Sequence, residues 1–453
     1  MTIWNTALNK GNKAQALASL IADAIANGEL QAGEKLPTQR ALAEQLQLGI
    51  GTITRALALA EQQGHIQCKV GSGCYVKAQN QRQWGEEQQP DSLGMWQNLA
   101  VDQDRASPLL ELFQLYQHNP AQLNQLLNDE TAQGALFQRQ ILAEWLNQPS
   151  MHAEQLFFCY GGQHGLQTAL LASGLAGQSL MCEELCYPGL SNLARQLNIK
   201  LKPIKLDEQG LCPDSLEAVL QHNSCRHLYL TPNQQNPTAS TMSLERRERI
   251  VELAQRYQLT VIEDDVSSPL AQSPAPLQSL LPEQVIYLNS FSKGVFRGLR
   301  FGYLHVPQAM IQEFTRSIRA NAWLVSPLLI DLACQWIKQG HAEHALAQQA
   351  SQLKQRAALL HHYLKGFDYR YQEGGLHCWL QLPSGWSSNS FAEAAKQQGL
   401  ELASAEHFSV SGQVPNAIRL SLGQLSDNLA LDQALALLRQ LLNEGVPNSS
   451  DLC

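Results

Sequence analysis

The residues best suited to covalent chemistry lie in the run SFSKGVFRGLRFGY, from Ser290 to Tyr303. Lys293 follows Ser292 directly, and Arg300 comes seven positions later. Serine hydroxyls and a guanidinium suit a phosphate dianion, because hydrogen bonds to a charged acceptor are the strong ones. A buried lysine amine with a lowered pKa suits imine formation with an aldehyde. The run predicts a lysine condensed with a phosphorylated aldehyde cofactor, and the alternative is an ordinary Ser-Lys loop before a strand.

Two other positions fit such a site. Gly161, Gly162 and Gln163 end an expected strand and open an expected helix, where backbone N–H groups can hold a phosphate. Asp264 ends another expected strand. If the aldehyde cofactor carries a pyridine ring, an aspartate beneath the ring nitrogen keeps that nitrogen protonated and makes the ring an electron sink. Taken alone, the glycine pair is also typical of a simple turn, and Asp264 of a strand-end residue that caps a loop.

The elements that must position these residues follow from the hydrophobic pattern. From about Leu109 onward, helical patterns alternate with short apolar runs, which predicts a large α/β domain around a mainly parallel sheet. Leu376–Gln381 and Ala417–Leu422 predict strands of a smaller C-terminal α+β lobe. The apolar runs of the large sheet are Leu156–Cys159, Ser179–Cys182, His227–Thr231, Leu259–Glu263, Val285–Leu288 and Gly302–Val306.

The beginning of the chain predicts a separate domain. Helical patterns over residues 17–25, 39–46 and 52–63 are followed by two strands within residues 66–76, joined by a Gly-Ser-Gly turn. Helix, turn, helix and then a hairpin is the plan of a winged helix-turn-helix. An αα-hairpin with a solvated basic face is the alternative.

The candidate DNA contacts of this domain follow from that plan. An arginine on the second helix can reach phosphates, and the first turn of the third helix faces the major groove. The glycines of the turn let the wing tip approach the DNA backbone closely. The candidates are Arg40, Thr52, Thr54, Arg55, Gly71, Ser72 and Gly73.

Composition narrows the class of protein. With 453 residues, 44% hydrophobic and 16% charged, the chain is expected to be a soluble protein of more than one domain. It has no apolar run near the ~18 residues of a membrane span and no signal pattern at its start, which predicts a cytoplasmic location. Ten cysteines without CxxC pairs predict free thiols and no metal site.

Charge and polarity predict how the domains are divided. The net charge is −8, but residues 1–80 carry seven basic and five acidic side chains, a net of 7 − 5 = +2. That asymmetry is compatible with a DNA-binding head on an acidic body. A Gln-rich polar stretch follows the head and predicts a linker. We expect a winged-helix domain at 1–78, a linker at 79–104 and the large domain at 105–445.

The head resembles the winged-helix domain of GntR-family bacterial regulators. The shared pattern is LP-x-x-R-x-L-A, then T-[IV]-T-R-A, then G-S-G-x-[YF]-V, and it covers nearly the whole domain. The resemblance implies operator binding. Many family members have Ser-Arg where this chain has Gly49-Ile50, so a contact from that arginine is not carried over.

The body resembles fold-type I aminotransferases and, together with the head, MocR-type regulators. The resemblance covers most of residues 105–445 and implies that pyridoxal 5'-phosphate binds Lys293 as a Schiff base. It further implies that Tyr187 of CYPG stacks on the pyridine ring and that Asn236 of the NPT turn bonds the phenolic oxygen. It implies that Arg419 of AIRLSL pairs with a substrate carboxylate. Without it, a core aromatic, a plain turn and a surface arginine are the alternatives.

Position 266 departs from the MocR pattern. These proteins usually read Glu-Asp-Asp-Tyr, whereas this chain has Val266 in place of the tyrosine. Valine cannot donate a hydrogen bond to the phenolic oxygen, which predicts poor catalytic turnover. The last residue of the NPTG turn also differs, being Ala239.

The sequence thus predicts a homodimeric transcription regulator that binds double-stranded DNA and pyridoxal phosphate, and that responds to the cofactor or to an amino compound. Two alternatives remain: a working aminotransferase with an accessory head, and a repressor whose body is only a dimerisation scaffold.

Overall fold

The computed structural model describes most of the chain and divides it into two compact units. One unit comprises Met1–Glu87 and Ser384–Ala394, and the other comprises Gln88–Pro383 and Ala395–Cys453. The described residues are 4, 13–26, 29–31, 33–63, 65–69, 73–76, 93–267 and 273–444. None of the described helices is long and apolar enough to cross a membrane.

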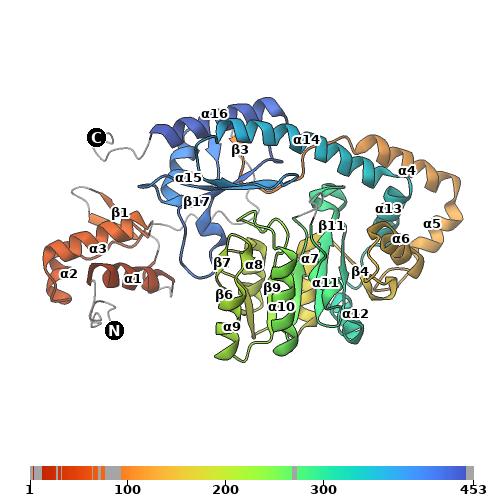
Figure 1. Cartoon of the computed structure of the whole chain (residues 1–453), viewed down its shortest axis with the longest axis horizontal. Coiled ribbons are helices and arrows are strands. Elements are labelled where there is room, and N and C mark those ends of the chain that lie inside the picture. The colour runs from red at the N-terminus through yellow and green to blue at the C-terminus, as the bar shows by residue number, and fades with distance from the viewer. Residues whose placement is uncertain are drawn as a thin grey trace. The chain divides into compact units, whose positions relative to one another are not determined.

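The head is a winged helix-turn-helix, as the sequence predicted (Figure 1). Its elements are α1 (Lys13–Ala26), α2 (Gln39–Gln45), α3 (Ile50–Gln62), β1 (Ile66–Lys69) and β2 (Gly73–Val76). The side chain of Thr38 caps α2 by accepting a hydrogen bond from the Ala41 amide at 3.2 Å. The helices enclose an apolar core that includes Leu17, Leu42 and Leu57.

The wing corrects the prediction that every cysteine is a free thiol. Strands β1 and β2 pair antiparallel, with Cys68 opposite Cys74, and these two residues form a disulfide. The cysteine spacing shows no CxxC pair, but the hairpin register places residues six positions apart directly opposite each other. Seven other cysteines among the described residues are free: Cys159, Cys182, Cys186, Cys212, Cys225, Cys334 and Cys378.

A seven-stranded sheet forms the centre of the body. In spatial order its strands are β4 (Leu156–Cys159), β12 (Gly302–His305), β11 (Val285–Ser290), β10 (Thr260–Asp264), β9 (His227–Leu230), β5 (Ser179–Glu183) and β6 (Lys200–Ile204). β12 runs antiparallel to both its neighbours, and the other pairs are parallel. The predicted, mainly parallel sheet is confirmed.

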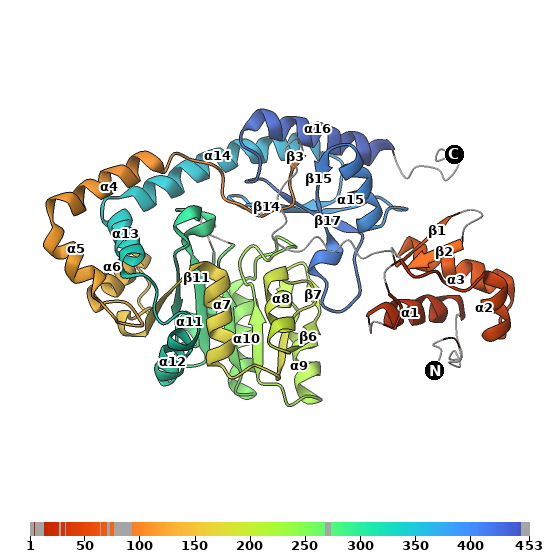
Figure 2. The same cartoon turned by 180° about the vertical axis from the view of Figure 1, so that it is seen from behind.

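Helices cover both faces of this sheet (Figures 1 and 2). Residues that alternate along the strands enter two separate cores, so that Cys182 and Tyr229 pack under α7, α8 and α12, whereas Met181 and Leu228 pack under α9, α10 and α11. The bounds are α7 (Gly161–Ala172), α8 (Pro188–Gln196), α9 (Pro213–Gln221), α10 (Leu244–Arg256), α11 (Leu277–Leu280) and α12 (Ile311–Asn321).

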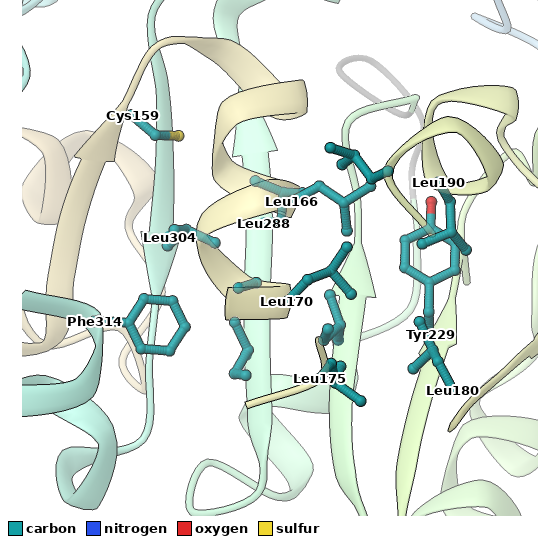
Figure 3. Packing of buried hydrophobic residues seen from close by; sticks show 14 of the residues in the cluster. Cys159, Leu166, Leu170, Leu175, Leu180, Leu190, Tyr229, Leu288, Leu304 and Phe314 are labelled. Atoms are coloured by element: carbon teal, nitrogen blue, oxygen red, sulfur yellow. The ribbon is translucent and has the colours of Figure 1, made fainter. Parts of the chain in front are cut away.

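Figure 3 shows the core beneath α7. Leu166 and Leu170 of that helix, Leu288 of β11, Leu304 of β12 and Phe314 of α12 are each at most 1% exposed. This packing fixes α7 on the sheet, and therefore fixes the N-terminus of α7 beside the carboxyl ends of the neighbouring parallel strands.

Of the remaining helices, α4, α5, α6 and α13 lie together at the β4 end of the large sheet, and α14 and α16 run along the smaller lobe (Figure 2). A third core joins α4, α6 and α13 to β4 and β12 through residues such as Leu112, Leu142 and Ile330. The bounds are α4 (Ala106–His118), α5 (Pro120–Leu127), α6 (Leu136–Leu146), α13 (Pro327–Lys338), α14 (His341–Tyr363), α15 (Ser388–Gln397) and α16 (Asn428–Glu444).

The smaller lobe contains the C-terminal sheet that the sequence predicted. Its order is β13 (Tyr369–Arg370), β14 (His377–Gln381), β17 (Ala417–Ser421) and β16 (Ala403–Ser404). Two separate two-stranded pairs complete the strands described: β15 (Leu400–Glu401) pairs with β3 (Leu93–Gly94), and β7 (Leu206–Asp207) pairs with β8 (Gly210–Leu211), directly after β6 in the chain.

The end of the predicted linker differs from the structure. Residues 93–94 form β3 in the lobe, and the Ser421 amide donates to the carbonyl of Met95 at 2.8 Å. The polar stretch before them, residues 79–92, lies outside the described residues.

Candidate functional site

Lys293 lies directly after β11, at the carboxyl end of a central strand of the large sheet. It ends a 3₁₀ turn (Phe291–Lys293) that follows β11 directly, and the Ser290 hydroxyl caps this turn by accepting from the Ser292 amide at 3.3 Å. Gln349 of α14 donates to the Lys293 carbonyl at 2.6 Å. The Lys293 ammonium donates to the backbone carbonyl of Asn98. The Ser290 cap and Gln349 of α14 therefore hold the backbone around Lys293, and the Asn98 carbonyl holds the end of its side chain.

The surroundings of Lys293 make its amine a nucleophile at neutral pH. Burial and the nearby guanidiniums of Arg419, Arg300 and Arg297 lower the lysine pKa from 10.5 to about 7, and the carboxylate of Asp264 opposes this shift only in part. Near pH 7 a large fraction of the amine is then unprotonated, which is the form that attacks a carbonyl carbon.

A cradle of polar groups lies at the N-terminus of α7, formed by Gly161, Gly162, Ser290, Ser292 and Arg300. Gly161 has φ +73°, and a methyl group there would lie 2.7 Å from Nη2 of Arg300 and 3.6 Å from the Ser292 hydroxyl. Arg300 donates to that hydroxyl through Nη1 at 3.1 Å. A methyl group on Gly162 would lie 3.9 Å from the Ser290 hydroxyl. Helix N–H groups, two hydroxyls and a guanidinium thus converge on one space, which fits a phosphate dianion.

Asp264 supplies a buried negative charge to the same site. It lies at the end of β10, and its carboxylate accepts from the Tyr229 hydroxyl at 2.7 Å and from the Val266 amide at 3.1 Å. Burial raises the pKa of this carboxyl to about 6, although the Tyr229 hydrogen bond lowers it. A cation beside the carboxylate would offset this burial, which is what a protonated pyridine nitrogen provides.

The side chains of Tyr187 and Gln163 lie next to each other and both contact Gly189. A methyl group on Gly189 would lie 2.2 Å from the Tyr187 ring and 2.3 Å from the Gln163 amide oxygen, and Gln163 donates to the Gly189 carbonyl at 3.1 Å. The hydroxyl of Tyr187 acts electrostatically on Arg419, which places the ring on the same side of the site as that arginine.

Arg419 and Asn236 form a direct pair. Arg419 is fully buried in β17 and donates through Nη1 to the Asn236 side-chain oxygen at 2.8 Å, and through Nη2 to the carbonyl of Trp96. Its guanidinium lies 4.9 Å from the centre of the Phe408 ring. Burial lowers the arginine pKa to about 9. Its Nε is buried and has no hydrogen-bond partner, so it is a donor that a ligand acceptor could satisfy.

Sequence reasoning missed the polar group behind this pair. The side-chain amide of Asn98 donates to His377 Nδ1 at 3.2 Å, and His377 Nε2 donates to the carbonyl of Gln235 at 3.0 Å. Burial and the charge of Arg419 lower the His377 pKa to about 3, so this imidazole is neutral. Asn98 was missed because it lies in the segment predicted as a linker. Its place shortly after β3 is the one feature that could have indicated a position in the body.

Val266 lies at the site as a purely apolar neighbour. Its Cγ2 would be 3.1 Å from a methyl group on Gly162, and its side chain packs on the core beneath α7. The hydroxyl that a tyrosine would bring to this position is absent from this chain.

In the head, the predicted contact residues lie on and around α3. Arg55 is exposed and donates through Nε to the Gly51 carbonyl at 3.2 Å, and the exposed Thr54 hydroxyl donates to the Gln39 side chain at 3.0 Å. Arg40 on α2 is exposed, and Thr52 is half-buried. Gly73 has φ +107°. The predicted contacts Gly71 and Ser72 lie outside the described residues.

Comparison with known proteins agrees with both parts of the chain. Residues 122–436 match the family "Aminotransferase class I and II", and residues 13–76 match "Bacterial regulatory proteins, gntR family". The "Uncharacterized HTH-type transcriptional regulator YdeF" of Bacillus subtilis is 30% identical over 97% of each chain. The "Vitamin B6 salvage pathway transcriptional repressor PtsJ" of Salmonella typhimurium is 25% identical over 96% of this chain and 99% of its own.

The fold of the body is shared with solved aminotransferases. An archaeal alanine:glyoxylate aminotransferase superposes with a TM-score of 0.72 at 20% identity, covering 78% of this chain and 91% of its own. With a gntR-type head, an aminotransferase class I and II body and a relative that matches along nearly its whole length, the chain belongs to the MocR-type family of HTH transcriptional regulators.

Proposed function

We propose that this regulator binds pyridoxal 5'-phosphate at Lys293 and adjusts its operator affinity to the state of that site. One observation carries the proposal: a lysine whose pKa is lowered to about 7 lies with the Gly161–Ser292–Arg300 cradle and the buried Asp264 carboxylate. Each of these groups matches a different part of the cofactor, namely its aldehyde, its phosphate and its ring nitrogen.

The residues would divide the binding as follows. Gly162, Ser290, Ser292 and Arg300 hold the phosphate, Asp264 keeps the ring nitrogen protonated, Tyr187 stacks on the ring with Gln163 beside it, and Asn236 bonds the phenolic oxygen. The cofactor, once bound, supplies an aldehyde that captures amines and a ring that withdraws electrons. Arg419 would take the carboxylate of an amino compound, because a guanidinium pairs with it in bidentate fashion.

We further propose that the effector is pyridoxal phosphate itself or an amino acid that reaches it. The name of PtsJ, a repressor of a vitamin B6 salvage pathway, favours the cofactor. The unpartnered Nε of Arg419 favours an amino acid, because it leaves a donor for a carboxylate. The two effectors would use different contacts: the Arg419 guanidinium would pair only with the carboxylate of an amino acid, whereas Lys293 would bond the cofactor in both cases.

The regulator would act as a cytoplasmic homodimer on double-stranded DNA. Self-association is supported by large apolar side chains that are exposed on three helices, α4, α5 and α6, since apolar side chains gathered on a surface mark an interaction site. Two heads in a dimer would read paired half-sites. These side chains are Leu110, Phe113, Leu127, Leu136 and Phe137.

The experiment measures cofactor binding and DNA binding on the same protein. Wild type, Lys293→Ala and the exposed-lysine control Lys338→Ala are titrated with pyridoxal phosphate, followed by visible absorbance and by peptide mapping after borohydride reduction. We expect a reducible cofactor on residue 293 in wild type and in the control, and none in Lys293→Ala. Operator affinity, measured by fluorescence anisotropy, should change with cofactor only in the two proteins that bind it.

The same measurements separate the alternatives. An operator affinity that ignores both cofactor and amino acids would leave the scaffold interpretation. Sustained transamination with any common amino donor and keto acid would place the protein among the enzymes. A response to amino acids that survives Arg419→Ala would exclude Arg419 as the carboxylate partner.

A further inference from the structure

The wing carries two cysteines that are not part of the proposed cofactor site. Cys68 on β1 and Cys74 on β2 are direct partners in the antiparallel register and are bonded through their sulfur atoms. Both side chains are half-buried, packed on the edge of the head core, so small thiols and disulfides can reach them. The three residues with predicted DNA contacts at the wing tip, 71–73, lie between them in the sequence.

The pair also lies at the junction between the wing and the recognition helix. The Cys68 amide donates to the carboxylate of Glu61, in the last turn of α3, at 2.6 Å. On the other strand, the Lys35 ammonium lies 5.5 Å from the centre of the Tyr75 ring, and Lys35 pairs with Tyr75 as an isolated β-bridge. The base of the hairpin is therefore anchored on both strands, and beyond that base the disulfide is the cross-link nearest the tip among the described residues.

We propose that Cys68 and Cys74 form a reversible thiol–disulfide switch that tunes the affinity of the head for DNA. This inference rests on the proposed DNA-binding function. In a cytoplasmic protein, cellular thiols keep such a pair reduced, and a disulfide there is usually transient and redox-sensing. The structure described here corresponds to the oxidised state of the switch.

The reaction uses a low-molecular-weight disulfide as the oxidant. The thiolate of one cysteine attacks a sulfur of that disulfide, forming a mixed disulfide and releasing one small thiolate. The second cysteine thiolate then attacks the protein sulfur of the mixed disulfide, which forms the Cys68–Cys74 bond and releases the second small thiolate. The two protein thiols lose two electrons, the oxidant gains them, and the two protons end on the two small thiols.

The direction of the effect follows from the geometry. The bond links β1 to β2 at the Cys68–Cys74 pair, next to the last pair of the ladder, Lys69–Gly73, and so reduces the conformational freedom that the two strands lose when the wing docks on DNA. Oxidation therefore strengthens binding. Because the bond removes part of this entropy cost before binding, it should raise operator affinity roughly threefold to tenfold.

The test uses the full-length protein and a DNA duplex enriched from a random-sequence pool by the reduced wild type. Protein equilibrated with reduced or oxidised glutathione is digested without reduction and mapped by mass spectrometry, and its affinity for the duplex is measured in parallel. We expect a Cys68–Cys74 linkage only in the oxidised sample, together with a threefold to tenfold lower Kd that dithiothreitol reverses. The double variant Cys68→Ser/Cys74→Ser should keep the Kd of the reduced wild type in both buffers, and Cys212→Ser, which removes a half-buried thiol of the body, should behave as wild type.

Three results would overturn the inference: no Cys68–Cys74 linkage in oxidised glutathione, a linkage that leaves Kd unchanged, or a linkage that weakens binding. Failure of the underlying function gives a different result. If no duplex is enriched by the reduced protein, DNA binding itself fails and the switch fails with it. If the duplex binds equally in both states, only the switch is excluded.

Discussion

Lys293 should capture pyridoxal phosphate at a pH where an ordinary lysine is protonated. Burial and the charges of Arg419, Arg300 and Arg297 lower its pKa from 10.5 to about 7. Because only the neutral amine attacks the aldehyde, the rate should rise with pH and level off above about pH 8. At pH 7 about half of this amine is neutral, against about one in 3,000 for an ordinary lysine, a ratio on the order of 10³.

Rapid mixing of cofactor-free protein with pyridoxal phosphate measures this rate through the visible absorbance of the bound cofactor. The aldehyde has ionisations of its own, so each rate is divided by that of N-acetyl-lysine amide at the same pH. The ratio isolates the titration of the protein amine. We expect the ratio to be largest and nearly constant below about pH 7, where both neutral fractions rise in parallel, and to fall above pH 7, where the protein amine is already neutral and the reference amine is still losing its proton.

A charge variant tests the stated cause. Arg297 is exposed on the turn after Lys293, so Arg297→Gln removes one of the charges that lower the pKa while leaving Arg300 and Arg419 in place. The midpoint of the rate profile should move to higher pH. Arg316→Gln, an exposed arginine of α12, is the matched control and should not move it. A wild-type midpoint above about pH 9 would refute the assignment of a low lysine pKa, and an unshifted midpoint in Arg297→Gln would refute the role of that charge.

Three more predictions follow from the same structure. Gly161→Ala should weaken cofactor binding about tenfold or more, because the added methyl group would clash with Arg300 and one charge-assisted hydrogen bond contributes about 1.5–3 kcal/mol. The control Gly174→Ala, also at positive φ but with open space around it, should show the backbone strain without the loss of binding. Equal losses of affinity for the two variants in calorimetric titrations would contradict the role of Gly161 in the phosphate site. Arg55→Ala should lower operator affinity and flatten the log–log salt slope by about 0.9 if it contacts a phosphate, which anisotropy titrations at several salt concentrations will decide. With Val266 in place of a hydroxyl donor, coupled assays over a panel of amino acids should detect no rapid multiple turnover, and sustained turnover would contradict this.

The sequence predicted the parts of the fold that depend on local pattern. The helix–turn–helix and hairpin of the head, the alternating strands and helices of the body and the C-terminal strands all have a hydrophobic period that reports which face is buried. Ser290, Ser292 and Arg300 were found because they lie within ten residues of Lys293 and are brought to it by one turn.

Contacts between distant segments could not be predicted in this way. Nothing in the local pattern places Asn98 against His377, or the carbonyl of Trp96 against Arg419, because these pairs depend on how β3 joins the lobe. The Cys68–Cys74 bond required the register of a hairpin, which a spacing rule does not contain. Charge effects on Lys293 likewise arise from residues that the fold gathers around it.

The segment that contains Trp96 and Asn98 occupies hydrogen-bond donors that ligands of the site would need. The carbonyls of Trp96 and Asn98 already accept from Arg419 and Lys293, the two cations that an amino acid and the cofactor would require. A ligand that took these two donors would bind by exchange: it would displace the carbonyls, and its affinity would be the difference between the bonds it makes and those it breaks. Both residues lie in the segment that joins β3 to α4, so a ligand that displaced their carbonyls would also change how this segment is held in the body.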